Sequence, residues 1–150
     1  MAAIAMDRLE SAGIVQYEIS NFAKPGFESR HNLAYWTFKP YLGLGPSAHS
    51  YLAPRRFSNV AGTPEYVSLV LDVKETTAME ETLTPQQQWL ERLFLGLRLP
   101  AGVEEGSVPG PESEALVAEG LLERCAGRLA LTRRGRVLCD AVTARLVGRG

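Results

Sequence analysis

The segment around Tyr17–Tyr51 constrains the fold more than any other part of the chain, because it contains two short apolar runs separated by a polar loop. We interpret the runs, Val15–Ile19 and Tyr41–Leu44, as buried strands. Each is followed at once by small or polar residues, Ser20-Asn21 after the first and Gly45-Pro46-Ser47 after the second. In a strand–helix fold, ligands bind at the loops that leave the C-terminal ends of strands. We therefore expect these loops to carry the function.

Length and composition describe a globular chain of one ordinary domain or two small ones. The 150 residues are 45% hydrophobic and 22% charged, which is typical of a soluble protein. No run approaches the roughly 18 apolar residues of a membrane-spanning helix. The N-terminus has no early basic region and reaches acidic residues too soon for a signal peptide. We expect a cytoplasmic protein with no integral membrane segment.

Periodicity and turn residues predict the remaining elements. Lys74–Leu83 is interpreted as a boundary, and Leu99–Pro111, rich in Gly and Pro, as a loop. Pairs of Thr and Pro open two of the helices. The expected helices are 1–11 with Gly13 as its C-cap, 63–73, 85–98, 112–119 and 133–147 with Thr132 as its N-cap; the expected strands are 15–19, 41–44, 55–60 and a hairpin at 121–131.

Three strings, in this order, carry a resemblance to a known family: Y-E-I-S-N-F-A from Tyr17, H-N-x-x-Y-W from His31, and Y-L-G-L-G-x-S-A-H-S from Tyr41. With them the chain resembles the oxygen-independent coproporphyrinogen III oxidase-like radical SAM proteins, and within these the HemW haem-chaperone branch. The resemblance covers nearly the whole chain. It implies a role in porphyrin metabolism, with haem, a [4Fe–4S] cluster and S-adenosylmethionine as cofactors of full-length members.

The resemblance also implies a fold. Residues 1–76 are expected to form the C-terminal portion of a radical SAM partial β/α barrel with a haem-motif loop, and residues 77–150 a HemN-type winged-helix-like C-terminal domain. The fold class is α/β, or α+β for the isolated chain. A helix followed by the strand at 15–19 resembles half of a crossover unit, which needs parallel partner strands that this chain does not offer. We therefore expect a missing N-terminal barrel portion as a partner.

In the HemW branch the H-N-x-x-Y-W motif is associated with haem, which implies haem-binding roles for His31, Asn32, Tyr35 and Trp36. His31 is the candidate iron ligand, because a neutral imidazole ligates haem iron and nearby aromatic rings can stack on the porphyrin. If the segment is helical rather than an ordered loop, His31 shares a face with Tyr35. Arg30 could pair with a propionate. The alternative is a histidine and two aromatics that pack a loop against the barrel.

In the resembled family, the loop after the second expected strand lies near the S-adenosylmethionine pocket. The implied cofactor-binding residues are Gly43, Gly45, Ser47, Ala48 and His49. The alternative is a turn that requires small residues. His49 is also a possible second axial ligand of a haem iron.

Polar residues end the first expected strand at the position from which barrel side chains face a ligand. These residues are Glu18, Ser20 and Asn21. The alternative for Glu18 is a buried ion pair with Arg30 or Lys24.

The chain has two cysteines, Cys125 and Cys139, so the C-x-x-x-C-x-x-C cluster motif of the resembled family is not among its residues. Two thiols this far apart do not make an iron–sulfur or zinc site. We interpret both as buried small hydrophobes. The cluster ligands are expected in the missing portion, and this chain alone is not expected to perform radical chemistry.

Charge is balanced overall, with a formal net charge of −1, but it is unevenly distributed. The charged residues from Glu104 to Glu123 are acidic, whereas Arg133–Arg149 is rich in arginine. A winged-helix module would use Arg133, Arg134 and Arg136 as DNA phosphate contacts. The acidic stretch and the net charge argue against this, so we expect solvated faces and no nucleic-acid partner. Besides a haem chaperone, part of a coproporphyrinogen oxidase-type enzyme and a winged-helix module remain open.

Overall fold

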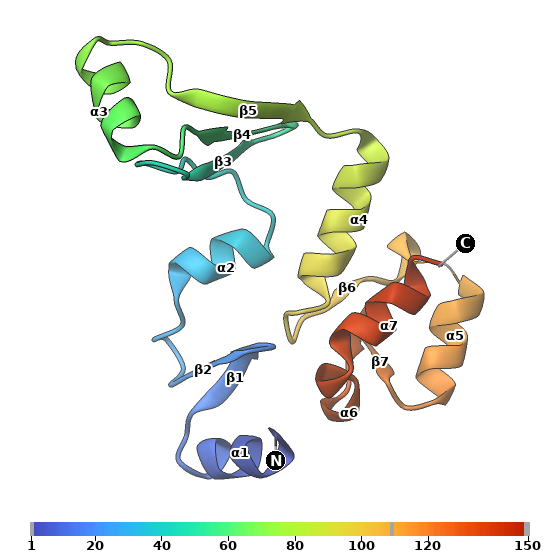
Figure 1. Ribbon diagram of the computed structural model, residues 1–150. Helices are drawn as coiled ribbons and strands as arrows, with labels where there is room; N and C mark the ends of the chain where they lie inside the picture. The colour runs from blue at the N-terminus through green and yellow to red at the C-terminus, as the bar shows by residue number, and fades with distance from the viewer. Residues whose placement is uncertain (1, 109, 149–150) are drawn as a thin grey trace. The chain divides into compact units, whose positions relative to one another are not determined.

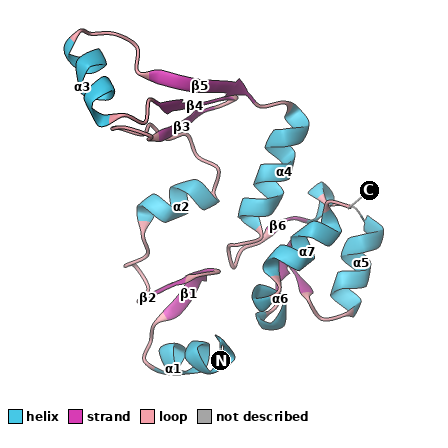
Figure 2. Ribbon diagram, in the orientation of Figure 1, coloured by secondary structure: helices cyan, strands magenta, loops and turns pink. Residues whose placement is uncertain are grey.

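The structure, a computed structural model, describes residues 2–108 and 110–148 (Figure 1). Helices and strands alternate along this chain in a mixed, α+β arrangement (Figure 2). The residues group into two compact units. Unit 1 comprises Met1–Thr37 and Leu90–Gly150, and unit 2 comprises Phe38–Trp89. The predicted division between residues 76 and 77 concerns domains of the resembled family, and it stays a prediction.

Unit 1 begins with the predicted helix and strand. Helix α1, Ala2–Ser11, ends before Gly13, whose φ of +72° gives the left-handed conformation expected of a glycine C-cap. Strand β1, Val15–Glu18, follows it, and helix α2, Arg30–Trp36, lies further along. Among the residues described, the expected helix at 1–11 and the expected strand at 15–19 are confirmed.

The environment of β1 differs from the prediction. Its neighbour is β2, Asn21–Ala23, which lies inside the expected loop and pairs with β1 in antiparallel fashion. The strand also buries its polar face, since Gln16 is 7% exposed and Val15 is 40% exposed. Gln16 tolerates burial because its amide donates to the Ile19 carbonyl at 2.7 Å and accepts from Arg136 at 3.1 Å.

Helix α4, Pro85–Gly96, begins with a reciprocal cap. The Gln87 backbone N–H donates to Thr84 Oγ1 at 3.2 Å, and the Thr84 N–H donates to Gln87 Oε1 at 2.8 Å. The helix predicted at 85–98 is therefore confirmed, to within two residues at its end.

The C-terminal part of unit 1 is a three-stranded antiparallel sheet with helices packed on it, in the order β6-β8-β7. Its core consists of side chains that are at most 2% exposed. The elements are β6, Val103–Glu104; η1, Glu105–Ser107; α5, Gly110–Ala118; β7, Leu122–Cys125; and β8, Arg128–Leu131. The core side chains are Leu93, Leu97, Leu116, Leu122, Leu129, Leu131, Val142 and Leu146. The predicted hairpin and the predicted helix before it are confirmed.

The last predicted helix is broken in two. Thr132 caps α6, Arg133–Val137, as predicted, by accepting from the Gly135 N–H at 3.0 Å. Leu138 then leaves helical geometry, with φ −114° and ψ 22°, and α7 runs from Cys139 to Leu146. Val137 and Leu138 lie at the break and are exposed, at 59% and 44%, whereas the apolar pattern of one unbroken helix at 133–147 would turn them inward.

A close contact explains why the first of these two helices lies where it does. A Cβ on Gly135 would lie 2.0 Å from the Leu121 carbonyl oxygen, so α6 lies tightly against the start of β7.

The two cysteines differ in their exposure, since Cys139 is buried and Cys125 is exposed. Cys125 ends a strand whose side chains after Leu122 are exposed, and its predicted burial is wrong.

Unit 2 contains a second three-stranded antiparallel sheet, in the order β3-β4-β5, and one helix. The strands are β3, His49–Leu52; β4, Arg55–Asn59; and β5, Thr77–Thr82. Helix α3 is Thr63–Leu71, with proline in its first turn. The predictions of β4 and α3 are confirmed.

The strand predicted at Tyr41–Leu44 is wrong. Only Tyr41 pairs, in an isolated bridge to Tyr51, and Leu42 and Leu44 are 62% and 81% exposed. The chain leaves the ladder at once, because the Gly43 N–H donates to the Ser50 side chain at 3.0 Å. Over the described residues, no helix has the length and apolar character needed to cross a membrane.

Candidate functional site

The H-N-x-x-Y-W motif forms helix α2, which settles the choice between a helix and an ordered loop (Figure 1). Ser29 is the N-cap, and its side chain accepts from the Asn32 N–H at 3.3 Å. At the other end, the Thr37 hydroxyl donates to the Leu33 carbonyl at 2.6 Å. A helix this short is stabilised by such side-chain bonds at its ends, because its own ladder is incomplete.

His31 lies on the exposed face of α2. Its ring makes an edge-to-face contact with the Tyr35 ring, with centroids 4.8 Å apart and planes at 90°. This is the favourable geometry for two aromatic rings one helical turn apart. The structure therefore presents an accessible imidazole whose orientation is supported by a neighbouring aromatic ring.

The other two motif residues turn toward the protein. The Asn32 amide lies 3.5 Å from the Tyr17 hydroxyl, at the outer limit of a hydrogen bond. The Trp36 indole lies under the Arg98 guanidinium, 4.9 Å from the ring centroid, a cation–π arrangement. The indole N–H is buried, and no residue that the structure describes bonds to it. The motif thus has two sides: His31 with Tyr35 outward, and Asn32 with Trp36 inward.

Arg30 and Glu18 do not form the ion pair considered from the sequence. Arg30 is exposed at the start of α2, whereas Glu18 is 1% exposed. One carboxylate oxygen of Glu18 accepts from the Ser20 N–H at 3.0 Å and from the Asn21 amide. The three polar residues that end β1 therefore bond to one another across the tight β1–β2 turn. The other Glu18 oxygen is buried with no hydrogen-bond partner within residues 2–108 and 110–148.

The loop before β3 is held by hydrogen bonds within unit 2. The Asn59 amide donates to the carbonyls of Gly43 and Gly45, at 3.3 and 2.9 Å. The Gly45 N–H donates to the Tyr66 hydroxyl at 3.1 Å. The Ser47 N–H donates to the Val60 carbonyl at 3.0 Å. Backbone donors that a cofactor would use are therefore already bonded to the chain.

The small residues of this loop have a structural reason. A Cβ on Gly43 would lie 2.2 Å from the His49 carbonyl oxygen and 2.9 Å from the Ala48 side chain. Gly45 and Ser47 both have positive φ, +105° and +58°. These features support the interpretation of a turn that requires small residues.

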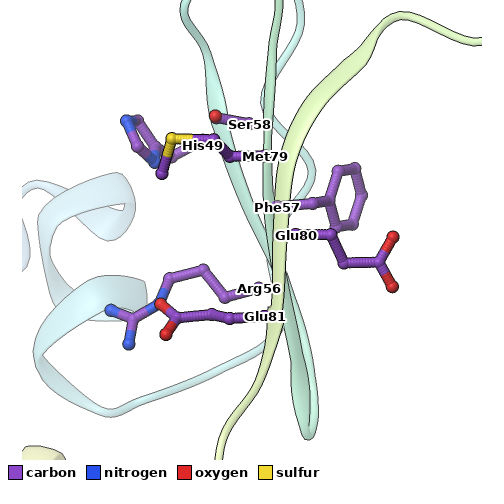
Figure 3. A pocket seen from close by; sticks show the side chains of 7 residues that line it. All are labelled: His49, Arg56, Phe57, Ser58, Met79, Glu80 and Glu81. Atoms are coloured by element: carbon purple, nitrogen blue, oxygen red, sulfur yellow. The ribbon is translucent and has the colours of Figure 1, made fainter.

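His49 stands at the end of the loop, on the first residue of β3. It pairs across the sheet with Ser58, which pairs in turn with Met79 on β5. Figure 3 shows the His49 and Met79 side chains on one face of the sheet, with Arg56 and Glu81 further along the same face. They line an open pocket of about 280 Å³. Arg56 Nε lies 2.8 Å from a Glu81 carboxylate oxygen, so that end of the pocket is occupied by an ion pair.

The residues present do not fit an iron–sulfur cluster. The chain has two cysteines, and one of them, Cys139, is buried at the start of α7. Burial raises the pKa of the Cys139 thiol, which disfavours the thiolate that a metal requires. Among the described residues, no three His, Cys, Asp or Glu side chains are grouped to hold a metal ion.

The arginines considered as DNA contacts have partners within unit 1. Arg133 bonds to Asp7, and its guanidinium is also 3.6 Å from Glu10. Arg134 donates to the Glu119 carbonyl at 3.1 Å, and Arg136 to Gln16 at 3.1 Å. Arg133 therefore has carboxylate partners, whereas Arg134 and Arg136 donate to neutral groups.

Sequence comparison identifies relatives across nearly the whole chain. The haem chaperone HemW of Bacillus subtilis is 35% identical over 160 residues, which cover 99% of this chain and 42% of that protein. The haem chaperone HemW of Mycobacterium tuberculosis is 38% identical over 94% of this chain and 37% of its own length. The chain is a homologue of the HemW family. It spans about two fifths of the length of these relatives.

This HemW homologue was also compared with solved structures and with family models. It superposes on the solved radical SAM coproporphyrinogen III oxidase, HemN, of Escherichia coli with a TM-score of 0.69, over 97% of this chain and 39% of that one. At 15% identity this likeness shows the fold alone, a mixed arrangement of helices and sheets. No family model matches the chain. The resemblance inferred from the three motifs is therefore confirmed by sequence relatives.

Sequence reasoning missed one residue near the motif. Arg98 lies far from α2 along the chain, yet its guanidinium packs on Trp36. Nothing in the spacing of the motif points to it, because the contact depends on how α4 ends beside β1. The local string L-R-L-P gives only a charged residue at a helix end.

Proposed function

We propose that this HemW homologue binds haem and that His31 ligates its iron. The observation that carries the proposal is the exposed imidazole on a capped helix, held edge to face against Tyr35. An iron ligand must be reachable by a flat macrocycle, and a buried histidine would not meet this condition. The relatives named as haem chaperones support haem as the ligand.

The motif residues have separate roles in this proposal. His31 supplies the nitrogen, and Tyr35 limits the rotation of the ring and offers an aromatic edge beside the porphyrin. Asn32 and Trp36 connect α2 to the rest of unit 1. Arg30, exposed in the first turn of the same helix, is placed to pair with a propionate.

The finer account of the fold belongs to the same proposal. Residues 1–76 would be the end of a radical SAM barrel, and residues 77–150 a winged-helix-like domain, in a cytoplasmic protein. The sheet order β6-β8-β7 with its helices supports the second part. The loop residues Gly43, Gly45, Ser47, Ala48 and His49 would approach S-adenosylmethionine through atoms other than the backbone donors already in use. The [4Fe–4S] cluster would require ligands outside this sequence.

Haem titration tests the ligand assignment. We expect the chain to give a Soret band of imidazole-ligated iron, and His31→Ala to lose that band and bind haem at least about tenfold more weakly. Free imidazole added to His31→Ala should restore the band, which separates the loss of a ligand from a loss of structure. Identical spectra and affinities for the native chain and His31→Ala would exclude His31 as the ligand.

The motif resemblance to oxygen-independent coproporphyrinogen III oxidase-like proteins supports a second candidate, in which this chain forms part of a porphyrinogen-oxidising enzyme. Product analysis on the full-length protein separates the two functions. Oxidative decarboxylation of coproporphyrinogen III would support the enzyme. Haem transfer to an acceptor without such a product would support the chaperone.

A further inference from the structure

A small cavity in unit 1 lies where the end of α4 meets β1 and the start of α7. Its volume is about 250 Å³, and the residues that line it include Ile19, Arg98, Arg136, Leu138, Cys139 and Asp140. The Ile19 N–H donates to the Arg98 carbonyl at 3.1 Å, which ties β1 to the segment that follows α4. The cavity is therefore built from three segments of one unit.

The guanidinium of Arg98 enters this cavity largely buried and weakly neutralised. Its side chain is 18% exposed, and its nearest carboxylate, Asp140, is 3.6 Å away and 85% exposed. The Arg98 Nε is buried with no hydrogen-bond partner in the part of the chain that the structure describes. A buried guanidinium without a close countercharge costs free energy, and an anion held in the cavity beside its exposed part would supply that charge.

Arg136 adds a second positive charge, and its hydrogen-bond partner among the residues that the structure describes is neutral. Its Nη1 donates to Gln16, a neutral amide, at 3.1 Å. Helix α7 also begins here, after Leu138, whose side chain offers no acceptor to the first-turn N–H groups. The partial positive charge of a helix start adds to that of the two arginines. Against these stands the exposed Asp140 carboxylate.

Much of the remaining lining of the cavity is apolar, which favours an anion that carries a hydrocarbon part. Ile19, Val137, Leu138 and Ala141 contribute hydrocarbon surface. The volume is below the roughly 300–1,000 Å³ of pockets that enclose a whole drug-sized ligand. A bare phosphate would leave the apolar wall unused, and a macrocycle would not fit. A short alkyl chain that ends in a carboxylate matches both the two arginines and the apolar wall.

We propose that the Arg98–Arg136 cavity binds a carboxylate carried on a short alkyl arm. The cavity is connected to helix α2 through Arg98, which lines the cavity and also packs on Trp36 of α2. If the proposed haem function holds, on which this step rests, the arm is one propionate of the tetrapyrrole, which Arg98 and Arg136 bind, and Arg30 stays placed to pair with the other. A free short-chain carboxylic acid is the other source of the same chemistry.

Butyrate tests the cavity without haem. In a titration of the ¹⁵N-labelled chain with sodium butyrate, we expect saturable shifts of the Arg98 and Arg136 Nε–H signals. Arg136→Gln should weaken binding about tenfold, as for the loss of one charge-assisted hydrogen bond. Arg136→Lys should recover part of the affinity. Arg134→Gln, two residues away in the same helix, is the matched control and should leave butyrate binding unchanged. Linear shifts without saturation, or equal effects of Arg134→Gln and Arg136→Gln, would overturn the proposal.

Haem and its dimethyl ester test the source of the arm. The native chain should bind haem more tightly than the diester, and Arg136→Gln should remove that preference while it keeps the imidazole-ligated Soret band. A retained preference in Arg136→Gln would reject the propionate assignment and leave ligation by His31 intact. Saturable butyrate binding with no His31-dependent band would support the cavity and reject the proposed haem function. The two proposals therefore fail in different measurements.

Discussion

Two antiparallel sheets of this chain have three strands each, but their central strands bury residues of opposite polarity. In the β6-β8-β7 sheet of unit 1, the central strand buries Leu129, Ala130 and Leu131. In the β3-β4-β5 sheet of unit 2, the buried residues of the central strand are Ser58 and Asn59. The first sheet is covered by helices with leucine side chains, whereas the second is held mainly by polar contacts.

The polar contacts of unit 2 centre on Asn59. Its amide donates to two loop carbonyls, and its carbonyl oxygen accepts from Thr76 Oγ1 at 3.0 Å. An exposed ion pair, Arg55 with Glu80 at 2.6 Å, joins β4 to β5. A buried network of this kind specifies a loop conformation because all its members have partners.

Unit 2 also leaves apolar side chains uncovered. On and just after α3, Leu71 is 76% exposed and Val73 is 93% exposed, and Met79 on β5 is 69% exposed. The hydrophobic effect therefore contributes less to unit 2 than to the leucine core of unit 1. The comparison teaches that strand number says little about what stabilises a sheet, and that the two units should respond to different mutations.

The largest effect is expected from truncation of the unit 1 core. Leu129→Ala removes a side chain that is 0% exposed and should lower the free energy of unfolding by about 2–5 kcal/mol. Met79→Ala, on the exposed face of the other sheet, should stay within about 0.5 kcal/mol of the native chain. Urea unfolding followed by circular dichroism measures both. Similar losses for the two variants would break the comparison.

An intermediate effect is expected from removal of the polar centre of unit 2. Asn59→Ala leaves two carbonyls and the Thr76 hydroxyl without their partner, which should cost about 1–3 kcal/mol. Amide exchange of Gly43, Gly45 and Ser47 should become faster, while the β7–β8 hairpin keeps its protection. Thr76→Val, which removes one of the three bonds, should have a smaller effect. Unchanged exchange in Asn59→Ala would show that the loop is held by other contacts.

The smallest effect concerns an ionic link within unit 1. The hydrogen bonds from Arg145 lower the pKa of Glu119 below its usual value of 4.5, and the charges of Arg145 and Arg134 add to this. Since the carboxyl has a lower pKa in the folded state, its contribution to stability is present above about pH 4.5 and is lost as the pH falls through the folded-state pKa. Glu119→Gln should therefore reduce stability slightly at pH 6 and not at pH 2. A loss of equal size at both values would mean that the carboxylate charge is not responsible.

The sequence predicts the elements that are defined by local patterns. Helix α4, the hairpin at 121–131 and the Thr132 cap all follow from neighbouring residues, and all are confirmed. Strand β5, T-A-M-E-E-T, could not be predicted, because it is an exposed edge strand with no apolar alternation. It becomes a strand by pairing with β4, a distant partner along the chain.

The candidate site shows the same limit. The sequence leaves a helix and an ordered loop open for the H-N-x-x-Y-W motif, and the structure shows a helix. Given a helix, the shared face of His31 and Tyr35 follows from residue spacing and agrees with the structure. The inward position of Trp36 does not follow from spacing, since it depends on the packing of Arg98. The strand prediction at Tyr41–Leu44 failed because it rested on apolar composition, which does not indicate the close approach of Gly43 to the His49 carbonyl.

The edge-to-face contact between His31 and Tyr35 affects the affinity expected for the proposed ligation of haem iron. A free surface histidine samples several rotamers, and a ligand that captures it must suppress all but one. Here the contact with Tyr35 already restricts the rotamers of His31, so less side-chain entropy would be lost on the proposed ligation of iron. Replacement of Tyr35 would then weaken the proposed coordination indirectly, because the His31 imidazole would become more mobile.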